Sequence, residues 1–196
     1  MAKQTPLILG KRFEEAFALA NQLHKGHLRK ASDAPYVSHL LSTAALVLQD
    51  GGDEDEAIAA LLHDAVEDQG GEETLALIRE KFGDKIAKIV DECSDTDIIP
   101  KPPWRERKEA HIVRLKGASP ATHRVILADK LHNARSLLRG LREDGEEAWK
   151  ISKGGKSGIL WNFRTMHEVL GEFNQGYLWQ ELGRMVKEIE RLAGAE

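Results

Sequence analysis

Length, composition and charge exclude several classes of protein. The chain has 196 residues, of which 41% are hydrophobic and 31% charged, and its formal net charge is −4. This composition is typical of a globular chain rather than a disordered one, and the length fits one domain. A general nucleic-acid binder needs a basic excess, which this chain lacks.

Cysteine usage and hydropathy indicate the compartment. Cys93 is the one cysteine, so no intramolecular disulfide is expected, and a reducing compartment such as the cytoplasm fits. No run of about 18 apolar residues is present, so no membrane-spanning helix is predicted. Residues 1–10 contain one lysine and a few apolar side chains, which is too weak a pattern for a signal peptide. No oligomeric state is predicted.

Helical periodicity dominates the first half of the chain. Apolar residues recur at steps of three and four from Phe13 to Leu23, which predicts a helix over 10–27. Glycines then separate further apolar segments, as helix breakers do. The predicted helices that follow cover 38–50, 53–68, 72–82 and 84–93.

The second half begins with a predicted loop over 95–103, because three prolines there remove backbone donors and restrict the residues before them. A Gly/Lys/Ser-rich stretch over 152–158 predicts a second, mobile loop. Helices are predicted over 104–116, 120–142, 159–172 and 176–194. No alternating strand pattern of useful length occurs, so the expected architecture is all-α, a multi-helix single domain over 1–196.

A polar corner interrupts the apolar segment that begins near residue 57. On a continuous helix, His63 and Glu67 share a face, as do Asp64 and Asp68. Carboxylates this close repel one another, and a bound divalent cation would relieve that repulsion. The alternative is a solvated acidic end of a helix.

His39 and Asp129 are the other candidate ligands, because both lie beside apolar runs where an unpaired charge is costly. Taken singly, a histidine at a helix start is commonly a cap or a surface residue, and a buried aspartate commonly pairs with a cation. The ordered set of His39, then His63-Asp64, then Asp129 favours a shared site.

This ordered set on an all-helical chain resembles the HD superfamily of metal-dependent phosphohydrolases. Flanking stretches narrow the resemblance to the hydrolase domain of RelA/SpoT-type alarmone enzymes, over about residues 10–140. The single-domain small alarmone hydrolases are the most similar type, and the helices of 145–196 would complete the same HD domain. The matching stretches are His24–Lys30, Pro35–His39, Leu61–Asp68, Phe82-Gly83, Ser94-Asp95, Ile99–Lys101, Glu106–Lys108 and Leu127–Arg135.

The resemblance implies a single metal ion, usually Mn²⁺ in this family. Two histidines and two carboxylates would also suit Zn²⁺ or Fe²⁺. The ion would lower the pKa of a bound water and polarise a phosphoryl oxygen. The implied ligands are His39, His63, Asp64 and Asp129, and Glu67 and Asp68 match the catalytic pair that orients or deprotonates the attacking water.

The resemblance also implies contacts to a nucleotide. Arg29 and Lys30 match the base-recognition pair, and the planar guanidinium of an arginine can stack on a purine. Lys101 matches a lysine expected on the pyrophosphate, and Asn133 matches a residue near the ribose. Without the resemblance, Arg29 and Lys30 would be a basic loop exposed to water. Arg107 and Lys108, which add positive charge near Lys101, would then be partners of acids on an exposed helix.

The expected function is therefore hydrolysis of the 3′-pyrophosphate of a purine alarmone, (p)ppGpp or (p)ppApp. The products would be the nucleoside 5′-di- or triphosphate and pyrophosphate. One alternative is an HD phosphohydrolase for another nucleotide, such as a 5′-nucleotidase or an NADPH phosphatase. Another is a catalytically silent alarmone-binding regulator, although the intact Glu67 and Asp68 and the four ligands argue against it.

Overall fold

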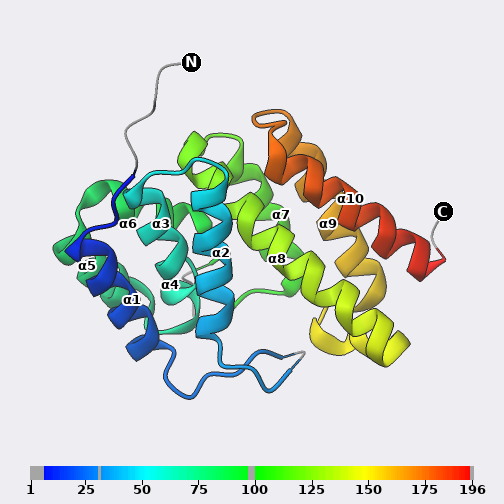
Figure 1. The fold of residues 1–196 in the computed structure, drawn as a ribbon. Coiled ribbons are helices and arrows are strands. Elements are labelled where there is room, and N and C mark those ends of the chain that lie inside the picture. The colour runs from blue at the N-terminus through cyan, green and yellow to red at the C-terminus, as the bar shows by residue number, and fades with distance from the viewer. Residues whose placement is uncertain (1–6, 31, 97–99, 195–196) are drawn as a thin grey trace.

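The computed structural model describes residues 7–30, 32–96 and 100–194 (Figure 1). Within these ranges the fold is all-helical, as predicted, and the one extended contact is an isolated antiparallel bridge between Leu28 and Pro35. No helix of the described residues is both long and apolar enough to cross a membrane. The predicted loop over 95–103 is non-helical on both sides of residues 97–99, which lie outside the described residues. Residues 1–6 lie outside them as well.

Most helices follow one another with short connections, and the longer connections lie at 24–36 and 94–103. The helices are α1 (Lys11–Leu23), α2 (Val37–Gln49), α3 (Glu54–Leu62), α4 (Ala65–Asp68), α5 (Gly71–Phe82), α6 (Asp84–Cys93), α7 (Trp104–Leu115), α8 (Pro120–Asp144), the 3-10 helix η1 (Gly145–Ile151), α9 (Gly155–Gly171) and α10 (Tyr177–Ala193).

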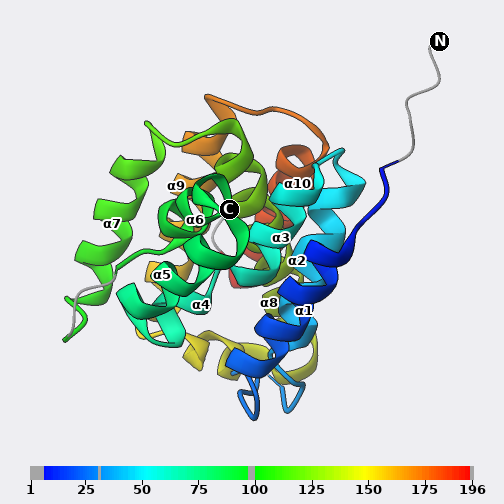
Figure 2. The same ribbon diagram turned by 90° about the vertical axis from the view of Figure 1, so that its left-hand side faces the viewer.

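The 25-residue helix α8 organises the molecule. It packs against α2, α3 and α6 on the N-terminal side and against α9, α10 and η1 on the C-terminal side. Figure 1 shows α10 running along α8, and Figure 2 shows α7 and α1 at opposite edges. Leu127 and Leu131 of α8 are fully buried, and each such side chain stabilises a fold by about 1.5–3 kcal/mol.

The prediction of one continuous helix over 53–68 is wrong. The chain leaves the helix at His63 and Asp64 and resumes as the single turn α4. The cause is local: Nδ1 of His63 lies 2.8 Å from the carbonyl oxygen of Ala60. In a continuing helix that oxygen would accept from the backbone N–H of Asp64. The break separates Glu67 from His63, so these residues do not share one helix face.

The prediction of a mobile loop over 152–158 is wrong for its second half, because α9 begins at Gly155. Gly154 and Gly158 lie against the indole ring of Trp104. A Cβ added to Gly154 would lie 2.8 Å from two ring atoms, and one added to Gly158 would lie 3.0 Å from the nearest. The glycines here allow close packing between α7 and α9.

Candidate active site

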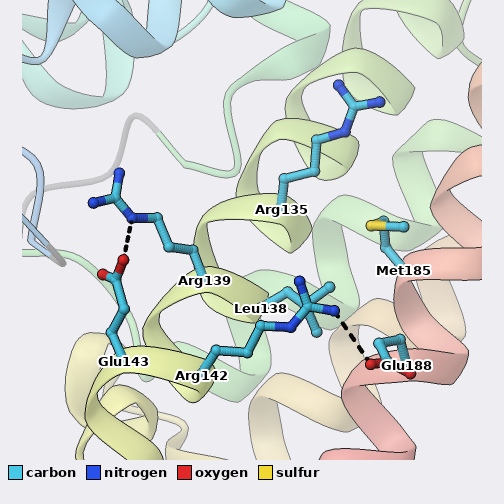
Figure 3. Close-up of a pocket in the computed structure, with 7 residues that line it drawn as sticks. All are labelled: Arg135, Leu138, Arg139, Arg142, Glu143, Met185 and Glu188. Carbon is cyan, nitrogen blue, oxygen red and sulfur yellow. Dashed lines mark hydrogen bonds and ion pairs between the residues drawn. The ribbon is translucent and has the colours of Figure 1, made fainter.

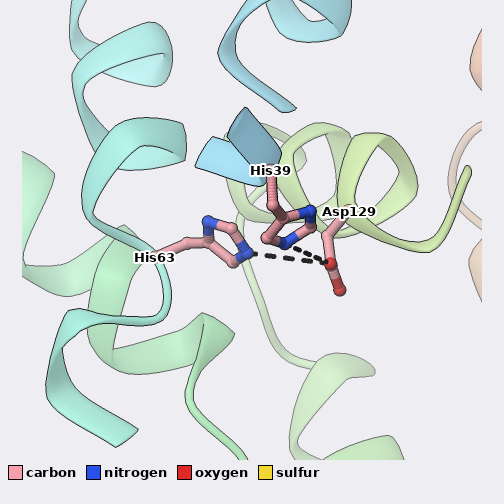
Figure 4. A group of neighbouring side chains, drawn as sticks. All are labelled: His39, His63 and Asp129. Carbon is pink, nitrogen blue, oxygen red and sulfur yellow. Dashed lines mark ion pairs between the residues drawn. The ribbon is translucent and has the colours of Figure 1, made fainter. Parts of the chain in front are cut away.

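His39, His63 and Asp129 converge in the interior although they are far apart in the chain (Figure 4). His39 lies in the first turn of α2, His63 in the turn after α3, and Asp129 in the middle of α8. The Nε2 atoms of His39 and His63 lie 3.2 and 3.7 Å from Oδ1 of Asp129. All three residues are buried, and their ligating atoms lie within 4.8 Å of one another. The packing of α2 and α3 on α8 brings them together.

The carboxylate of Asp64 lies against both histidines of this group. Its Oδ2 lies 3.3 Å from Nε2 of His39 and 3.1 Å from Nε2 of His63. The Tyr36 hydroxyl donates a 2.7 Å hydrogen bond to the same oxygen. Burial and the charge of Asp64 raise the pKa of Tyr36, so the hydroxyl keeps its proton and remains a donor. The structure thus brings all four predicted ligands to one point.

Both carboxylates of this group are ionised. Burial opposes ionisation, but the imidazoles of His63 and His39 outweigh it and hold the pKa of Asp64 well below its usual range. Lys130 and the same imidazoles do so for the pKa of Asp129. Two ionised carboxylates and two imidazoles form a nitrogen and oxygen donor set that suits a divalent cation.

A buried nitrogen atom without a hydrogen bond is also consistent with a cation site. Nε2 of His63 is buried and makes no hydrogen bond within the described residues. The Nδ1 of that ring lies 2.8 Å from the Ala60 carbonyl oxygen, an acceptor only, which assigns the proton to Nδ1. Burial lowers the pKa of His63, but Asp64 and Asp129 outweigh it and raise that pKa well above its usual range, so without a metal the ring carries a second proton at Nε2, facing their oxygens. A bound cation would replace that proton and take the Nε2 lone pair.

Asp129 is held from both sides. The amide of Asn133 donates a 2.5 Å hydrogen bond to its Oδ1, and Lys130 lies 2.7 Å from its Oδ2. Burial lowers the pKa of Lys130, but Asp129 outweighs burial and raises it. Sequence reasoning missed Lys130, for which the only signal was its position directly after Asp129.

Glu67 and Asp68 lie on α4, which follows the turn that carries His63 and Asp64. Oε1 of Glu67 lies 3.1 Å from Nζ of Lys101 and 3.4 Å from Nη1 of Arg107. Burial and the nearby Asp95 raise the pKa of Glu67. Burial and Asp64 raise the pKa of Asp68. Carboxyl groups with a raised pKa hold and release a proton more readily near neutrality, as general acids and bases require.

Asp95 lies in one of the stretches that match the family, and the structure brings it close to Glu67. It is buried, and its oxygens lie 2.5 Å from Nη1 of Arg107 and 2.6 Å from Nζ of Lys108. Burial raises its pKa, but the two cations outweigh burial and lower it to about 2. Arg107 and Lys108 are therefore anchored partners of a buried acid, not partners of exposed acids on their own helix.

The predicted nucleotide contacts differ in where they lie. Nη2 of Arg29 donates a 2.8 Å hydrogen bond to Oδ1 of Asn133, and the guanidinium lies 5.5 Å from the centre of the Tyr36 ring. Arg29 and Asn133 therefore border the cluster, whereas Lys101 lies against the carboxyls of α4. Lys30 is exposed, and its charge opposes the rise in the pKa of Asp68.

A separate surface cavity of about 370 Å³ lies between α8 and α10 (Figure 3). None of its lining residues belongs to the cluster or to the predicted nucleotide contacts. The lining residues are Arg135, Leu138, Arg139, Arg142, Glu143, Met185 and Glu188.

Comparisons with known proteins agree with the geometry. The family model of the HD domain matches residues 16–153. The guanosine-3′,5′-bis(diphosphate) 3′-pyrophosphohydrolase MESH1 of Xenopus tropicalis is 37% identical over 150 residues, which are 75% of this chain and 78% of that protein. A probable GTP pyrophosphokinase of Mycobacterium leprae is 34% identical over 125 residues, 63% of this chain but only 16% of that protein.

A solved structure gives the same fold. It is described as a metazoan ortholog of SpoT that hydrolyses ppGpp, and it matches with a TM-score of 0.75 over 98% of this chain and 99% of its own. The sequence identity is 24%, so this likeness concerns the fold. The family match over residues 16–153 and the MESH1 relative show that the chain belongs to the HD-domain family, in its RelA/SpoT-type branch.

Proposed function

We propose that the protein is a metal-dependent 3′-pyrophosphohydrolase acting on a purine alarmone, (p)ppGpp or (p)ppApp. The observation that carries this proposal is the convergence of His39, His63, Asp64 and Asp129 beside the carboxyls of α4. The MESH1 relative, which bears the name of this activity and matches over most of its length, supports the same substrate class. We place the enzyme in the cytoplasm, with the free nucleotide as its partner.

The four converging residues would hold one divalent cation, for which we propose Mn²⁺. The cation would polarise a phosphoryl oxygen and lower the pKa of a water molecule. The chain's own contribution is to keep Asp64 and Asp129 ionised and to direct Nε2 of His63 toward them.

Glu67 and Asp68 would manage protons. Water adds to the phosphorus attached to the 3′-oxygen, and the bond between that phosphorus and the 3′-oxygen breaks. The water's proton passes to a carboxylate, and the departing 3′-oxygen receives a proton. The balance is alarmone plus water giving nucleoside 5′-di- or triphosphate plus pyrophosphate. The raised pKa values of both carboxyls suit this exchange.

Cations beside α4 would bind the pyrophosphate. Nζ of Lys101 lies 3.1 Å from Glu67 and 3.9 Å from Asp68. A bound pyrophosphate would compete with these carboxylates for the lysine and so release Glu67 for proton transfer. Arg29 would present its guanidinium to the purine, with Asn133 near the ribose and Lys30 at the exposed rim.

Product analysis tests the proposal. Metal-depleted protein, reloaded with Mn²⁺, would be offered ppGpp, ppApp, NADPH and dAMP separately, and the products resolved by ion-exchange chromatography. We expect pyrophosphate with GDP or ADP, and the ratio of the two rates would define the base preference. The His63→Ala variant should be inactive.

The other substrates distinguish the rival functions. Phosphate release from NADPH or dAMP, without pyrophosphate from either alarmone, would replace the proposal with another HD phosphohydrolase. Nucleotide binding without turnover of any of the four substrates would indicate a silent regulator. Equal turnover after reloading with Mn²⁺ and with Zn²⁺ would remove the preference for manganese.

A further inference from the structure

His39 and His132 contact each other through their rings. The Nδ1 atoms of the two residues are 2.7 Å apart, and the ring centres are 4.7 Å apart. His39 is 1% exposed, so water does not replace this partner. His132 lies three residues after Asp129 on α8, so one helical turn carries a proposed metal ligand and a group that contacts another.

Two Nδ1 atoms at this distance share one proton as a hydrogen bond. Which of the two rings donates that proton determines whether Nε2 of His39 can bind a cation. A neutral imidazole carries one proton. If His132 donates, His39 keeps its own proton on Nε2, the atom that lies 3.3 Å from Asp64 and 3.2 Å from Asp129. If His39 donates, its Nε2 has a free lone pair facing those oxygens. Only the second arrangement lets His39 bind a cation.

His63, the other proposed histidine ligand, has its Nδ1 proton fixed by a different kind of partner. For His63, the Nδ1 partner is the Ala60 carbonyl oxygen, which can only accept, so the tautomer is determined. For His39, Nδ1 contacts a side chain of another helix, His132 of α8, rather than a carbonyl oxygen. A group that accepts the proton of the second ring nitrogen orients a ligating histidine and raises its basicity.

We infer that His132 is a positioning residue that accepts the Nδ1 proton of His39 and thereby directs the Nε2 lone pair of His39 to the metal. This inference rests on the proposed metal site. Loss of the acceptor should weaken metal binding about 10- to 100-fold. The helical fold should persist, because the cluster's other three ligands and the contacts of α8 with its neighbours stay in place.

The test is a titration of the metal-depleted protein with Mn²⁺ and no nucleotide, followed by the electron paramagnetic resonance signal of free Mn²⁺. The His132→Phe variant removes the acceptor, whereas His132→Asn keeps one, because its Oδ1 occupies the position of Nδ1. We expect Kd to rise about 10- to 100-fold in His132→Phe and to return to within a few-fold of the wild type in His132→Asn. His132→Leu repeats the deletion with a smaller side chain if the phenylalanine does not fit.

Two further variants separate the possible failures. His123→Phe is the matched control, because His123 is a buried histidine of the same helix whose Nε2 contacts the Leu115 carbonyl instead. Its Kd should be unchanged. His39→Ala should abolish tight binding.

Unchanged Kd in His132→Phe or His132→Leu, with binding lost in His39→Ala, would overturn the role of His132 alone. So would an equal loss in His132→Asn and His132→Phe. Retained binding in His39→Ala would overturn the metal site itself, and the role of His132 with it.

Discussion

At the residue scale, the neighbours of each carboxyl group in the site determine whether its pKa is lowered or raised. Asp64 and Asp129 face imidazoles and a lysine, which keep them ionised despite burial. Glu67 and Asp68 face other carboxylates as well as a lysine, and their pKa values are raised. Environments that push the pKa values of neighbouring carboxyls apart assign different roles to them. The first pair suits metal ligation, and the second suits proton transfer.

Replacing Glu67 with glutamine should therefore separate turnover from metal binding. Gln keeps the size and one acceptor but cannot exchange a proton. We expect kcat on ppGpp to fall by about 10²- to 10⁴-fold, with the Kd for Mn²⁺ unchanged. Glu106→Gln, at an exposed position on α7, is the control and should keep the wild-type rate. Full activity in Glu67→Gln would remove this residue from the mechanism.

The same variant should change how stability depends on pH. Because the pKa of Glu67 lies above its ordinary 4.5 in the folded protein, the folded state binds this proton more tightly than the unfolded state does. Its stabilising contribution is therefore complete below about pH 4.5 and is lost as pH rises through the folded pKa. In urea denaturation without metal, Glu67→Gln should exceed the wild type in free energy of unfolding at pH 7. The difference should close toward pH 4.5, and a gap that widens in acid would contradict the assignment.

At the scale of secondary-structure elements, the ends of α3 determine where His63 lies, because His63 directly follows this helix. A capping box begins α3: Oδ1 of Asp53 accepts from the backbone N–H of Glu56, and Oε2 of Glu56 accepts from that of Asp53. The helix ends where the Nδ1 atom of His63, in place of a backbone N–H, contacts the carbonyl oxygen of Ala60. Both ends are thus determined by side chains close to them in the chain.

Asp53→Ala should destabilise the protein by about 1 kcal/mol, because the first turn of α3 loses its side-chain acceptor. Asp53→Asn keeps that acceptor and should cost only a few tenths of this amount, although both variants lose the ion pair with Lys85. Urea denaturation at pH 7 measures both. Equal losses would mean that the ion pair, rather than the cap, carries the effect.

The contact between α7 and α9 depends on glycine. Because Trp104 ring atoms lie 2.8 Å from an added Cβ, Gly154→Ala should cost about 1–3 kcal/mol in free energy of unfolding. Trp104→Leu should make the same substitution tolerable, so a double-mutant cycle should give a favourable coupling. Gly117→Ala is the control, since its nearest neighbour atom is 3.8 Å away. Additive effects of Gly154→Ala and Trp104→Leu would show that the two positions are independent.

At the scale of the whole molecule, α8 joins the motif-bearing residues 10–140 to the helices of 145–196. It packs on helices from both segments and carries Asp129 in the middle of its length. We therefore propose that residues 1–196 unfold as one domain, and that events at the metal site affect the stability of all of it.

Calorimetry tests this unit. We expect a single transition with equal calorimetric and van't Hoff enthalpies. Mn²⁺ at 100 times its Kd should stabilise the whole protein by about 2.7 kcal/mol, which corresponds to roughly 5–10 °C in Tm at this size. His63→Ala should show no such shift. Two transitions, with only the first responding to metal, would divide the chain into separate domains.

Most elements follow from local pattern. Helix α6 was predicted over 84–93 and spans Asp84–Cys93, because glycine, an apolar stripe and the following proline-rich segment mark it without help from the rest of the fold. The predicted helix over 10–27 ends earlier, at Leu23, because a turn with Gly26 at a φ of +77° leads into the bridge between Leu28 and Pro35. End positions of helices thus depended on contacts that periodicity does not contain.

The sequence by itself determined the all-helical class, most helices to within a few residues and, through its resemblance, the residues proposed to bind metal and transfer protons. Only the tertiary structure decided which residues support them: Tyr36 contacts Asp64, Asp95 lies near Glu67, and His132 contacts His39. These partners lie 28 to 93 positions apart. Local periodicity reports which face of a helix is apolar, whereas the meeting of two side chains from different helices depends on how those helices pack.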